Sequence, residues 1–312
     1  MGELHQLVLD LGAERAREQA ISKLDRQRTD AAIAVMQDDR FDLNVLHSAF
    51  ALTALPHRNT SQMIWERAGG QNGEMLLRIE SGYGFDRKPM GIPYGSLARL
   101  ILIHLSTEAV RNNSKVVELG SSMRAFLRRM GISAGGKTYS LVREQALKIA
   151  LCRLTLLNKR DRDTVISNGS FIKNAVIADD TGEIPLPLLQ ETVELDDAFF
   201  KSLTAHPLPL RESAIRQLSG RSTALDIYIF LSYRLHVLQR PLPITWKALH
   251  DQFGAGTASV STFKQNFKDP LALAQAVYPE ARLDLTDKGL TLYPSPSPVP
   301  KVHPWAHRLE TV

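Results

Sequence analysis

The sequence predicts an α+β protein in which one unit of helices and strands occurs twice. The block SMRAFLRRMG (122–131) aligns without a gap with TWKALHDQFG (245–254). Each block follows a long apolar helix and a short strand, and each precedes a second helix and a pair of strands. Helix, strand, helix, turn, helix, hairpin is the order of a winged helix. We therefore expect tandem winged-helix domains, each a helix-turn-helix with a β-wing, plus an N-terminal appendage of helices and a hairpin.

Charge is distributed unevenly along the 312 residues, which carry a net charge of +5. Residues 90–160 hold 12 Lys and Arg against three Glu, whereas residues 178–200 carry seven acids and no base. A basic block of this density is typical of a surface that binds a polyanion, although a solvated face is the alternative interpretation. We expect the following segments: 1–89, an N-terminal part that packs on or extends the first domain; 90–180, the first winged helix; 181–204, an acidic linker; 205–294, the second winged helix; and 295–312, a proline-rich tail.

The N-terminal part is predicted to contain a long amphipathic helix over 13–37 and a second helix over 42–54. A hairpin is expected to follow, because two apolar segments within 61–82 flank the turn residues Gly69, Gly70, Asn72 and Gly73. These strands are candidates for packing beside a winged helix or for a dimer interface.

In the first repeat, a long helix over 93–110 and a strand over 116–119 precede a short amphipathic helix. Ser121 and Ser122 are candidate N-caps for that helix. Its apolar stripe consists of Met123, Phe126, Leu127 and Met130. Arg124, Arg128 and Arg129 occupy its other faces, and Gly131 is a natural C-terminal stop.

The stretch GISAGGKT (131–138) matches the nucleotide phosphate-loop pattern G-x-x-x-x-G-K-[ST]. That pattern requires a buried strand before the loop, and here an amphipathic helix is predicted instead. We interpret Lys137 and Thr138 as the start of a second helix, whose N-terminus suits a DNA backbone phosphate. A phosphate-loop NTPase using Gly131–Thr138 remains the less favoured alternative, with the segment AVIADD (175–180) as its candidate second motif.

The second repeat has a helix over 222–238, a strand over 242–245 and a recognition helix over roughly 258–268. Val260, Phe263 and Phe267 are expected to hold that helix to the core, and Pro270 to break or kink it near 268–270. Outward side chains of the two repeats are of types that contact bases and phosphates. The candidate DNA-binding residues are Ser121, Ser122, Arg124, Arg128, Arg129, Lys137, Thr138, Tyr139, Ser140, Arg143 and Lys148 in the first repeat, and Lys247, Thr257, Ser259, Ser261, Thr262, Lys264, Gln265, Lys268 and Lys288 in the second.

Several classes of function find no support in the sequence. No apolar run reaches the roughly 20 residues of a membrane helix, and the N-terminus has no signal-peptide pattern, so we expect a cytoplasmic protein. The single Cys152 excludes an internal disulfide and a cysteine-based zinc site. The histidines show no convincing metal-ligand spacing, and neither G-x-S-x-G nor H-x-H with a nearby nucleophilic Tyr is present. We therefore expect no catalytic residues, no metal and no cofactor.

Several blocks in one order resemble the RepA-type replication initiators of Gram-negative plasmids. They are PYGSLARLILIHLSTEAV, LGSSMRAFLRRMGI, ALDIYIFLSYRL, WKALHDQFG and AVYPEARLDLTDKGLTLYPS, and the resemblance extends from about residue 62 to residue 298. It implies two winged-helix domains that bind directly repeated double-stranded DNA sites, called iterons, at a plasmid origin. It also implies opening of the origin, recruitment of the host initiator and replicative helicase, and a homodimer that represses its own gene. A winged-helix transcriptional repressor without initiation activity is the main alternative, and a DNA-nicking initiator is a further one.

Overall fold

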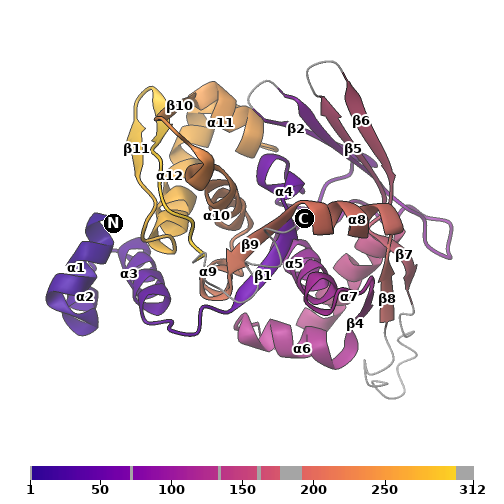
Figure 1. Cartoon of the computed structure of the whole chain (residues 1–312), viewed down its shortest axis with the longest axis horizontal. Coiled ribbons are helices and arrows are strands. Elements are labelled where there is room, and N and C mark those ends of the chain that lie inside the picture. The colour runs from indigo at the N-terminus through magenta and orange to yellow at the C-terminus, as the bar shows by residue number, and fades with distance from the viewer. Residues whose placement is uncertain (1, 71–72, 133–134, 160–162, 176–191, 300–312) are drawn as a thin grey trace. The chain divides into compact units, whose positions relative to one another are not determined.

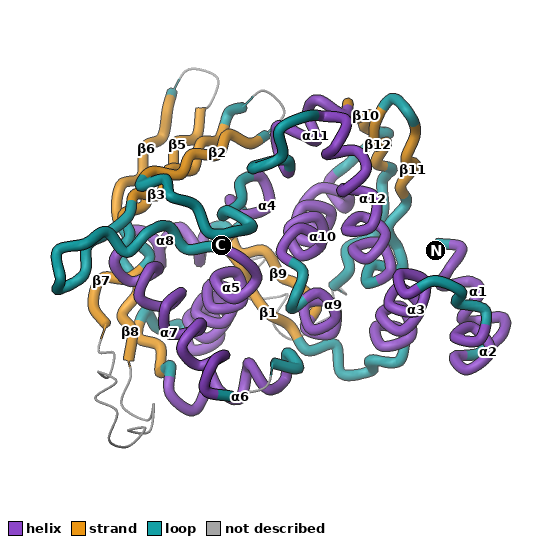
Figure 2. Tube along the Cα trace, turned by 180° about the vertical axis from the view of Figure 1, so that it is seen from behind, coloured by secondary structure: helices purple, strands orange, loops and turns teal. Residues whose placement is uncertain are grey.

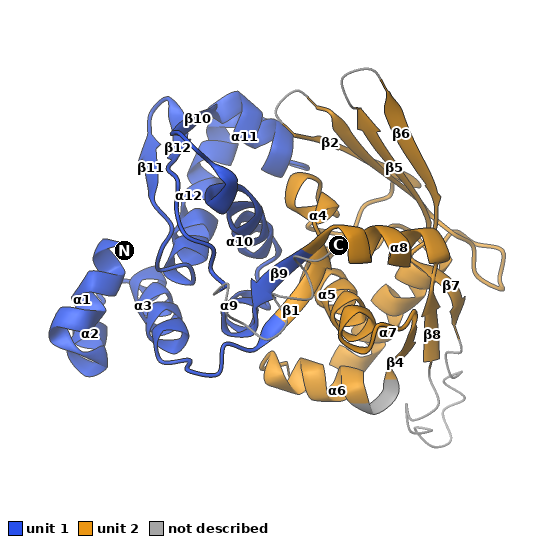
Figure 3. Cartoon of the chain, in the orientation of Figure 1, with its two compact units in different colours: residues 1–43, 208–312 blue, residues 44–207 orange. Residues whose placement is uncertain are grey.

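The computed structural model describes residues 2–70, 73–132, 135–159, 163–175 and 192–299. The chain is a mixture of helices and short antiparallel sheets and divides into two compact units (Figure 3). Unit 1 comprises Met1–Leu43 and Leu208–Val312, and unit 2 comprises Asn44–Pro207. Among the described residues, no helix is both long and apolar enough to span a bilayer.

Unit 2 contains two antiparallel sheets and a central helix, α5. Its elements in chain order are β1 (Leu43–His47, which starts at the last residue of unit 1), α4 (Ala49–Leu52), β2 (Ile64–Gly69), β3 (Met75–Glu80), α5 (Gly95–Asn112), β4 (Val116–Glu118), α6 (Gly120–Arg129), α7 (Gly136–Leu151), β5 (Arg153–Lys159), β6 (Thr164–Gly169), β7 (Ile172–Ala175), β8 (Thr192–Leu195) and α8 (Asp197–Ala205). One sheet has the order β2-β3-β5-β6 and the other β4-β8-β7 (Figure 1). The hairpin expected within residues 61–82 is the β2–β3 pair, in which Ala68 faces Leu76.

The core of unit 2 surrounds α5, which is buried over most of its length. Leu100, Ile101 and Ile103 are at most 1% exposed. A helix that is apolar on all sides must be covered on all sides, and α5 contacts α6, α7, α8 and β4. Helices α6 and α7, which lie within the basic residues 90–160, are therefore positioned by packing on one central element.

Unit 1 combines helices with one three-stranded sheet. Its elements are α1 (Glu3–Leu11), α2 (Ala13–Glu18), α3 (Lys23–Met36), β9 (Pro207–Arg211, whose first residue belongs to unit 2), α9 (Glu212–Leu218), α10 (Ser222–Arg234), the 3-10 helix η2 (Leu235–Val237), β10 (Leu242–Thr245), α11 (Trp246–Phe253), α12 (Val260–Ala276), β11 (Leu283–Thr286) and β12 (Gly289–Leu292). The sheet has the order β10-β12-β11 and is antiparallel throughout. Figure 2 shows its strands beside α12.

An aromatic cluster holds α10, α11 and α12 together. The rings of Trp246 and Phe267 lie 6.0 Å apart at 86°, and those of Phe253 and Phe230 lie 5.6 Å apart at 79°. Such edge-to-face contacts are favourable beyond the area they bury. At the β11–β12 turn, Gly289 has φ +148, and a Cβ there would lie 2.0 Å from the carbonyl oxygen of Ile244. Glycine is required at this point because the neighbouring strand passes so closely.

The N-terminal part differs from the expectation in two ways. The long helix predicted over 13–37 is divided into α2 and α3, and α3 begins with a capping box formed by Ser22 and Asp25. The segment predicted as a helix over 42–54 is instead strand β1 followed by the single turn α4.

The predicted 1–89 segment is also divided between the two units. Residues 1–43 group with 208–312, because α3 packs on α9 and α12 and the His5 ring nitrogen Nε2 lies 2.9 Å from the carbonyl oxygen of Ala276. Only the rest of the predicted segment belongs to the unit that contains the first repeat.

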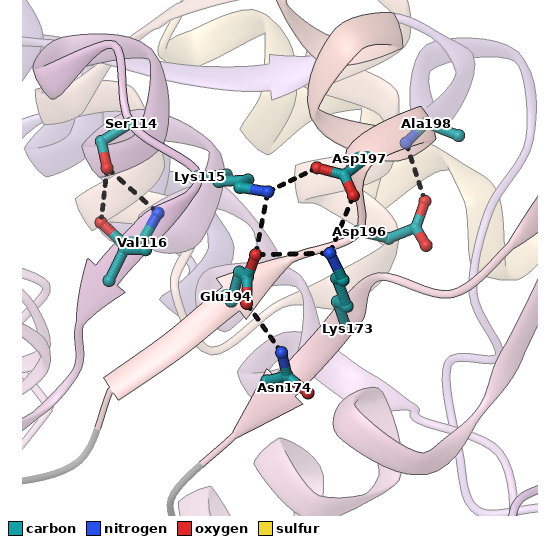
Figure 4. Close-up of polar contacts among 9 residues, drawn as sticks. All are labelled: Ser114, Lys115, Val116, Lys173, Asn174, Glu194, Asp196, Asp197 and Ala198. Atoms are coloured by element: carbon teal, nitrogen blue, oxygen red, sulfur yellow. Dashed lines mark hydrogen bonds and ion pairs between the residues drawn. The ribbon is translucent and has the colours of Figure 1, made fainter.

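The expected acidic linker over 181–204 contains ordered structure where it is described. Residues 192–205 form β8 and α8 within unit 2. Two lysines pair with two of its acids: Lys115 Nζ lies 2.9 Å from a carboxylate oxygen of Glu194 and 2.6 Å from one of Asp197, and Lys173 Nζ lies 3.0 Å from Asp197 (Figure 4). Leu195 of β8 and Phe199 and Leu203 of α8 are buried, so apolar packing holds this stretch in unit 2, and the ion pairs lie at its surface.

A break or kink was expected near 268–270; there is no break, since α12 continues through Pro270. Proline removes one helical hydrogen bond, the one to the carbonyl of Asn266. Asn266 is exposed, so water can replace that bond, while Phe263, Phe267 and Leu271 remain buried on the opposite stripe. Packing of this stripe outweighs the local cost of the proline.

Candidate nucleic-acid interface

In the first repeat, helix α6 precedes the glycine-rich stretch and helix α7 begins near its end. The stripe expected on α6 is buried, with Phe126 at 0% and Met130 at 1% exposure. The helix ends before Gly131, whose φ of +72 is the left-handed conformation typical of a C-terminal stop. A helix thus precedes the stretch GISAGGKT, and α7 begins within it at Gly136; residues 133–134 lie outside the described residues. The strand that a nucleotide phosphate loop requires does not stand before this loop.

The arginines of α6 differ in exposure. Arg128 and Arg129 are exposed, and Arg124 is half-buried. The Arg129 guanidinium lies 5.8 Å from the centroid of the Phe126 ring, a cation–π contact that orients it. In the part of the chain that the structure describes, no ion pair involves Arg128. Arg128 is therefore available to an anionic partner.

Ser122 takes part in the fold. Its hydroxyl donates to the carbonyl of Glu118 and lies 3.2 Å from Nε2 of His104. Burial lowers the pKa of His104 to about 3, so its ring is neutral, and Nε2–H donates to the serine oxygen. Ser122 thus connects α6 to α5, and its contact with DNA stays a prediction. The Ser121 side chain lies outside what the structure describes.

On α7 the predicted residues fall into two groups. Lys137 and Ser140 are exposed, whereas Thr138, Tyr139 and Arg143 are half-exposed. Lys148 does not lie on the outward face: its side chain is 6% exposed, with Nζ 2.8 Å from a Glu144 oxygen.

The second repeat has the same two-helix arrangement, and a side chain caps the N-terminus of each helix. The Thr245 hydroxyl accepts from the backbone N–H of Ala248 at 3.2 Å, and Ser259 accepts from Thr262 at 3.2 Å. Both are standard N-caps, so α11 and α12 begin at positions set by local sequence. The hydroxyls of Ser259 and Thr262 also lie 3.0 Å apart. Both residues are exposed and engaged with each other at the start of the helix.

Uncharged polar side chains and lysines cover the outward side of α12. Ser261, Gln265 and Lys268 are exposed, as expected. Asn266 is exposed as well and was missed by sequence reasoning. The spacing of Phe263 and Phe267 could have found it, because a 3.6-residue period directs position 266 away from the core.

The remaining predicted cations are partly engaged. Lys247 Nζ lies 2.9 Å from a carboxylate oxygen of Asp251, and Lys264 Nζ lies 5.3 Å from the centroid of the Trp246 ring. The Thr257 carbonyl oxygen lies 3.1 Å from Nε2 of His250, which ties the turn to α11. Lys288 is exposed on the turn between β11 and β12.

Four exposed cations of the predicted set have no ion pair among the described residues, and they come from both repeats. They are Arg128, Lys137, Lys268 and Lys288. Each unit thus presents unneutralised positive charge on or beside its two-helix element. No cluster of His, Cys, Asp and Glu suited to a metal ion occurs within the described ranges.

Comparison with known proteins identifies the family. The family model for plasmid encoded RepA protein matches residues 92–247, half of the chain. The chain therefore belongs to the RepA-type family of plasmid replication initiators.

Two crystal structures of domains 2 and 3 of RctB are also similar to the chain. One, of a selenomethionine derivative, is 12% identical, covers 71% of this chain and 82% of its own, and has a TM-score of 0.47. The other is 10% identical, covers 78% and 93%, and has a TM-score of 0.48. No curated protein sequence matches the chain.

Proposed function

We propose that this chain is a replication initiator that binds directly repeated double-stranded sites at a plasmid origin through two winged-helix domains. Membership of the RepA-type family is the observation that carries the proposal. By analogy with that family, the bound protein helps to open the origin, recruits the host initiator and replicative helicase, and represses its own gene as a homodimer. The proposed activity is binding in the cytoplasm, without catalysis or a cofactor.

The second repeat supports a winged helix through its topology. The order α10, β10, α11, α12, β11, β12, with the sheet order β10-β12-β11, is that of a helix-turn-helix followed by a β-wing. In this proposal α12 enters a major groove, and the β11–β12 turn with Lys288 contacts a neighbouring phosphate.

The first repeat has the same element order, α5, β4, α6, α7, β5, β6, with a modified sheet. Strand β4 pairs with β8, and β5–β6 extends the β2–β3 hairpin. We propose that β5–β6 is the wing of this domain. The exposed Arg128 and Lys137, near the loop between α6 and α7, support a role in gripping phosphates.

A footprint of the purified protein on the DNA that flanks its own gene tests the proposal, at about 150 mM salt with excess competitor. Protection that repeats at roughly 20 base pairs, two helical turns, in one orientation would support binding to iterons. A single palindromic footprint would favour a repressor, and no specific protection would overturn the proposal. Saturable ATP binding that Lys137→Ala abolishes would favour the NTPase alternative, and a covalent protein–DNA adduct would favour a nicking initiator.

A further inference from the structure

The segment between β3 and α5 carries the most exposed large apolar side chain among the described residues. Phe85 is 110% exposed and Tyr83 is 66% exposed. In Figure 2 this segment is the teal loop that extends away from the sheet. Burying a phenylalanine stabilises a protein by about 1.5–3 kcal/mol, so a ring that contacts nothing contributes nothing to the fold.

The loop is nevertheless well ordered by its own hydrogen bonds. The backbone N–H of Met90 donates to the carbonyl of Gly82 at 2.9 Å, and that of Gly84 donates to Lys88 at 3.0 Å. Arg87 has φ +60, which few residues other than glycine adopt, and its N–H donates to Gly84 at 3.0 Å. The chain thus maintains a strained turn that presents Phe85 at its tip.

The base of the loop is fixed against the end of α7. A Cβ on Gly82 would lie 2.1 Å from the carbonyl oxygen of Leu151, so only glycine allows this approach. The N–H of Gly91 donates to the Ser81 hydroxyl at 2.8 Å. The aromatic tip is therefore held in a defined place beside a helix of the proposed DNA-binding domain.

Charge indicates what the tip contacts. Arg87 has no ion pair in the described part of the chain, and Lys88 is paired only loosely, with its Nζ 3.9 Å from Asp86. An aromatic ring with adjacent cations is the combination that binds nucleic-acid bases, because the ring stacks on a base while the cations contact phosphates. A stable protein partner requires an interface above about 1,000 Å², whereas one projecting ring matches the face of one base.

We infer that Phe85 stacks on an unpaired base of opened DNA, with Arg87 and Lys88 holding the adjacent phosphates. Bases inside a duplex are already stacked, and separating them costs a few kcal/mol per step; bases of an opened origin are free. This inference rests on the proposed function, since opening of the origin supplies the single strand. It gives unit 2 a single-strand site in addition to its duplex surface.

Binding of the full chain to a fluorescent oligothymidylate of about 20 nucleotides tests the inference, because such a strand forms no duplex. We expect Phe85→Ala to weaken this binding by about 5- to 150-fold. Phe85→Trp retains a stacking ring and should bind at least as well as the unmodified protein. Phe85→Leu, apolar but not aromatic, should behave like Phe85→Ala. Ile21→Ala, which changes an 89% exposed side chain in unit 1, is the matched control and should have no effect.

Affinity for a duplex carrying the origin repeats is measured with the same variants and should not change. An equal loss on duplex and on oligothymidylate would overturn the inference in favour of a wedge into double-stranded DNA. The inference would also be overturned if Phe85→Ala leaves oligothymidylate binding intact, or if the unmodified protein does not bind oligothymidylate. Either result would favour a protein partner for the ring. Failure of the proposed function appears separately, as loss of the repeating footprint in the unmodified protein.

Discussion

Lys148 Nζ lies 2.8 Å from a carboxylate oxygen of Glu144, one turn earlier on α7. The same ammonium lies 4.6 Å from the centroid of the Tyr94 ring, and the lysine side chain is 6% exposed. This lysine was expected on the DNA-binding face of the recognition helix. Its position instead ties α7 to the segment that leads into α5.

We expect Lys148→Met to destabilise unit 2 by about 1–3 kcal/mol, because it removes a charge-assisted bond inside the protein. Urea unfolding measures this loss. The slope of log affinity against log salt on duplex DNA should stay unchanged. Glu144→Gln should destabilise as well, since it leaves the buried ammonium without its anion. A flatter slope for Lys148→Met would show instead that Lys148 contacts the DNA.

Lys137 is exposed at the start of α7 and has no ion pair in the described ranges, so it is available to a phosphate. We expect Lys137→Ala to flatten the log–log salt slope by about 0.9, the contribution of one neutralised phosphate. Titrations of duplex binding at several salt concentrations measure it. Lys201→Ala changes an exposed lysine of α8 in the same unit and is the matched control. A slope that both substitutions leave intact would refute the phosphate role of Lys137.

Gln265 is exposed on α12, on the side of the helix opposite the buried Phe263 and Phe267. A glutamine in a major groove can form two hydrogen bonds with adenine, which contributes about 1–3 kcal/mol of discrimination. We therefore expect Gln265→Ala to reduce the preference for origin repeats over scrambled duplex by about 5- to 150-fold. Competition binding measures the ratio, and Gln217→Ala on α9 serves as control. If the ratio is unchanged, α12 does not read bases through this residue.

Hydrogen bonds from Lys115 and Lys173 hold the pKa of the Asp197 carboxyl below its usual value of 3.8. Those from Lys115 and Asn174 lower the pKa of Glu194 below 4.5. The stability that these carboxylates contribute is complete above the usual values, because there they are ionised in both folded and unfolded chains. It is lost as the pH falls through the lower folded-state values, where the folded protein must take up the protons.

We therefore expect the Tm to fall more steeply on acidification from about pH 6 to about pH 3 in the unmodified protein than in a Glu194→Gln, Asp197→Asn double variant. Thermal unfolding followed by circular dichroism at several pH values tests this. Parallel curves for the two proteins would show that the four-charge cluster in Figure 4 adds no pH-dependent stability.

Pro270 lies inside α12 and cannot donate to the carbonyl of Asn266. Pro270→Ala restores this donor, so we expect it to stabilise unit 1 by about 1–3 kcal/mol. An increased urea midpoint with an unchanged m-value would establish the gain. A destabilised variant would show that the surrounding core is shaped to the proline.

Elements whose determinants are local could be predicted from the sequence. The second repeat is the clearest case, because its caps Thr245 and Ser259 and its stripe Phe263 and Phe267 lie within the helices that they specify. The β2–β3 hairpin and the helix end at Gly131 follow from turn chemistry in the same way. For the candidate site, the outward direction of Ser261 and Gln265 followed from the helical period, and the place of Lys137 at the start of a helix followed from the glycines before it.

Features that depend on distant partners could not be predicted in this way. The sequence by itself determined the two-helix elements and their exposed polar faces, because hydrophobic period and capping act over a few residues. Only the tertiary structure decided that Lys148 is buried, because the Tyr94 ring that it contacts lies far away in the sequence, on the segment before α5. It also decided that residues 1–43 join the second repeat and that β8 and α8 pack on lysines of unit 2, because these contacts join segments far apart in the chain.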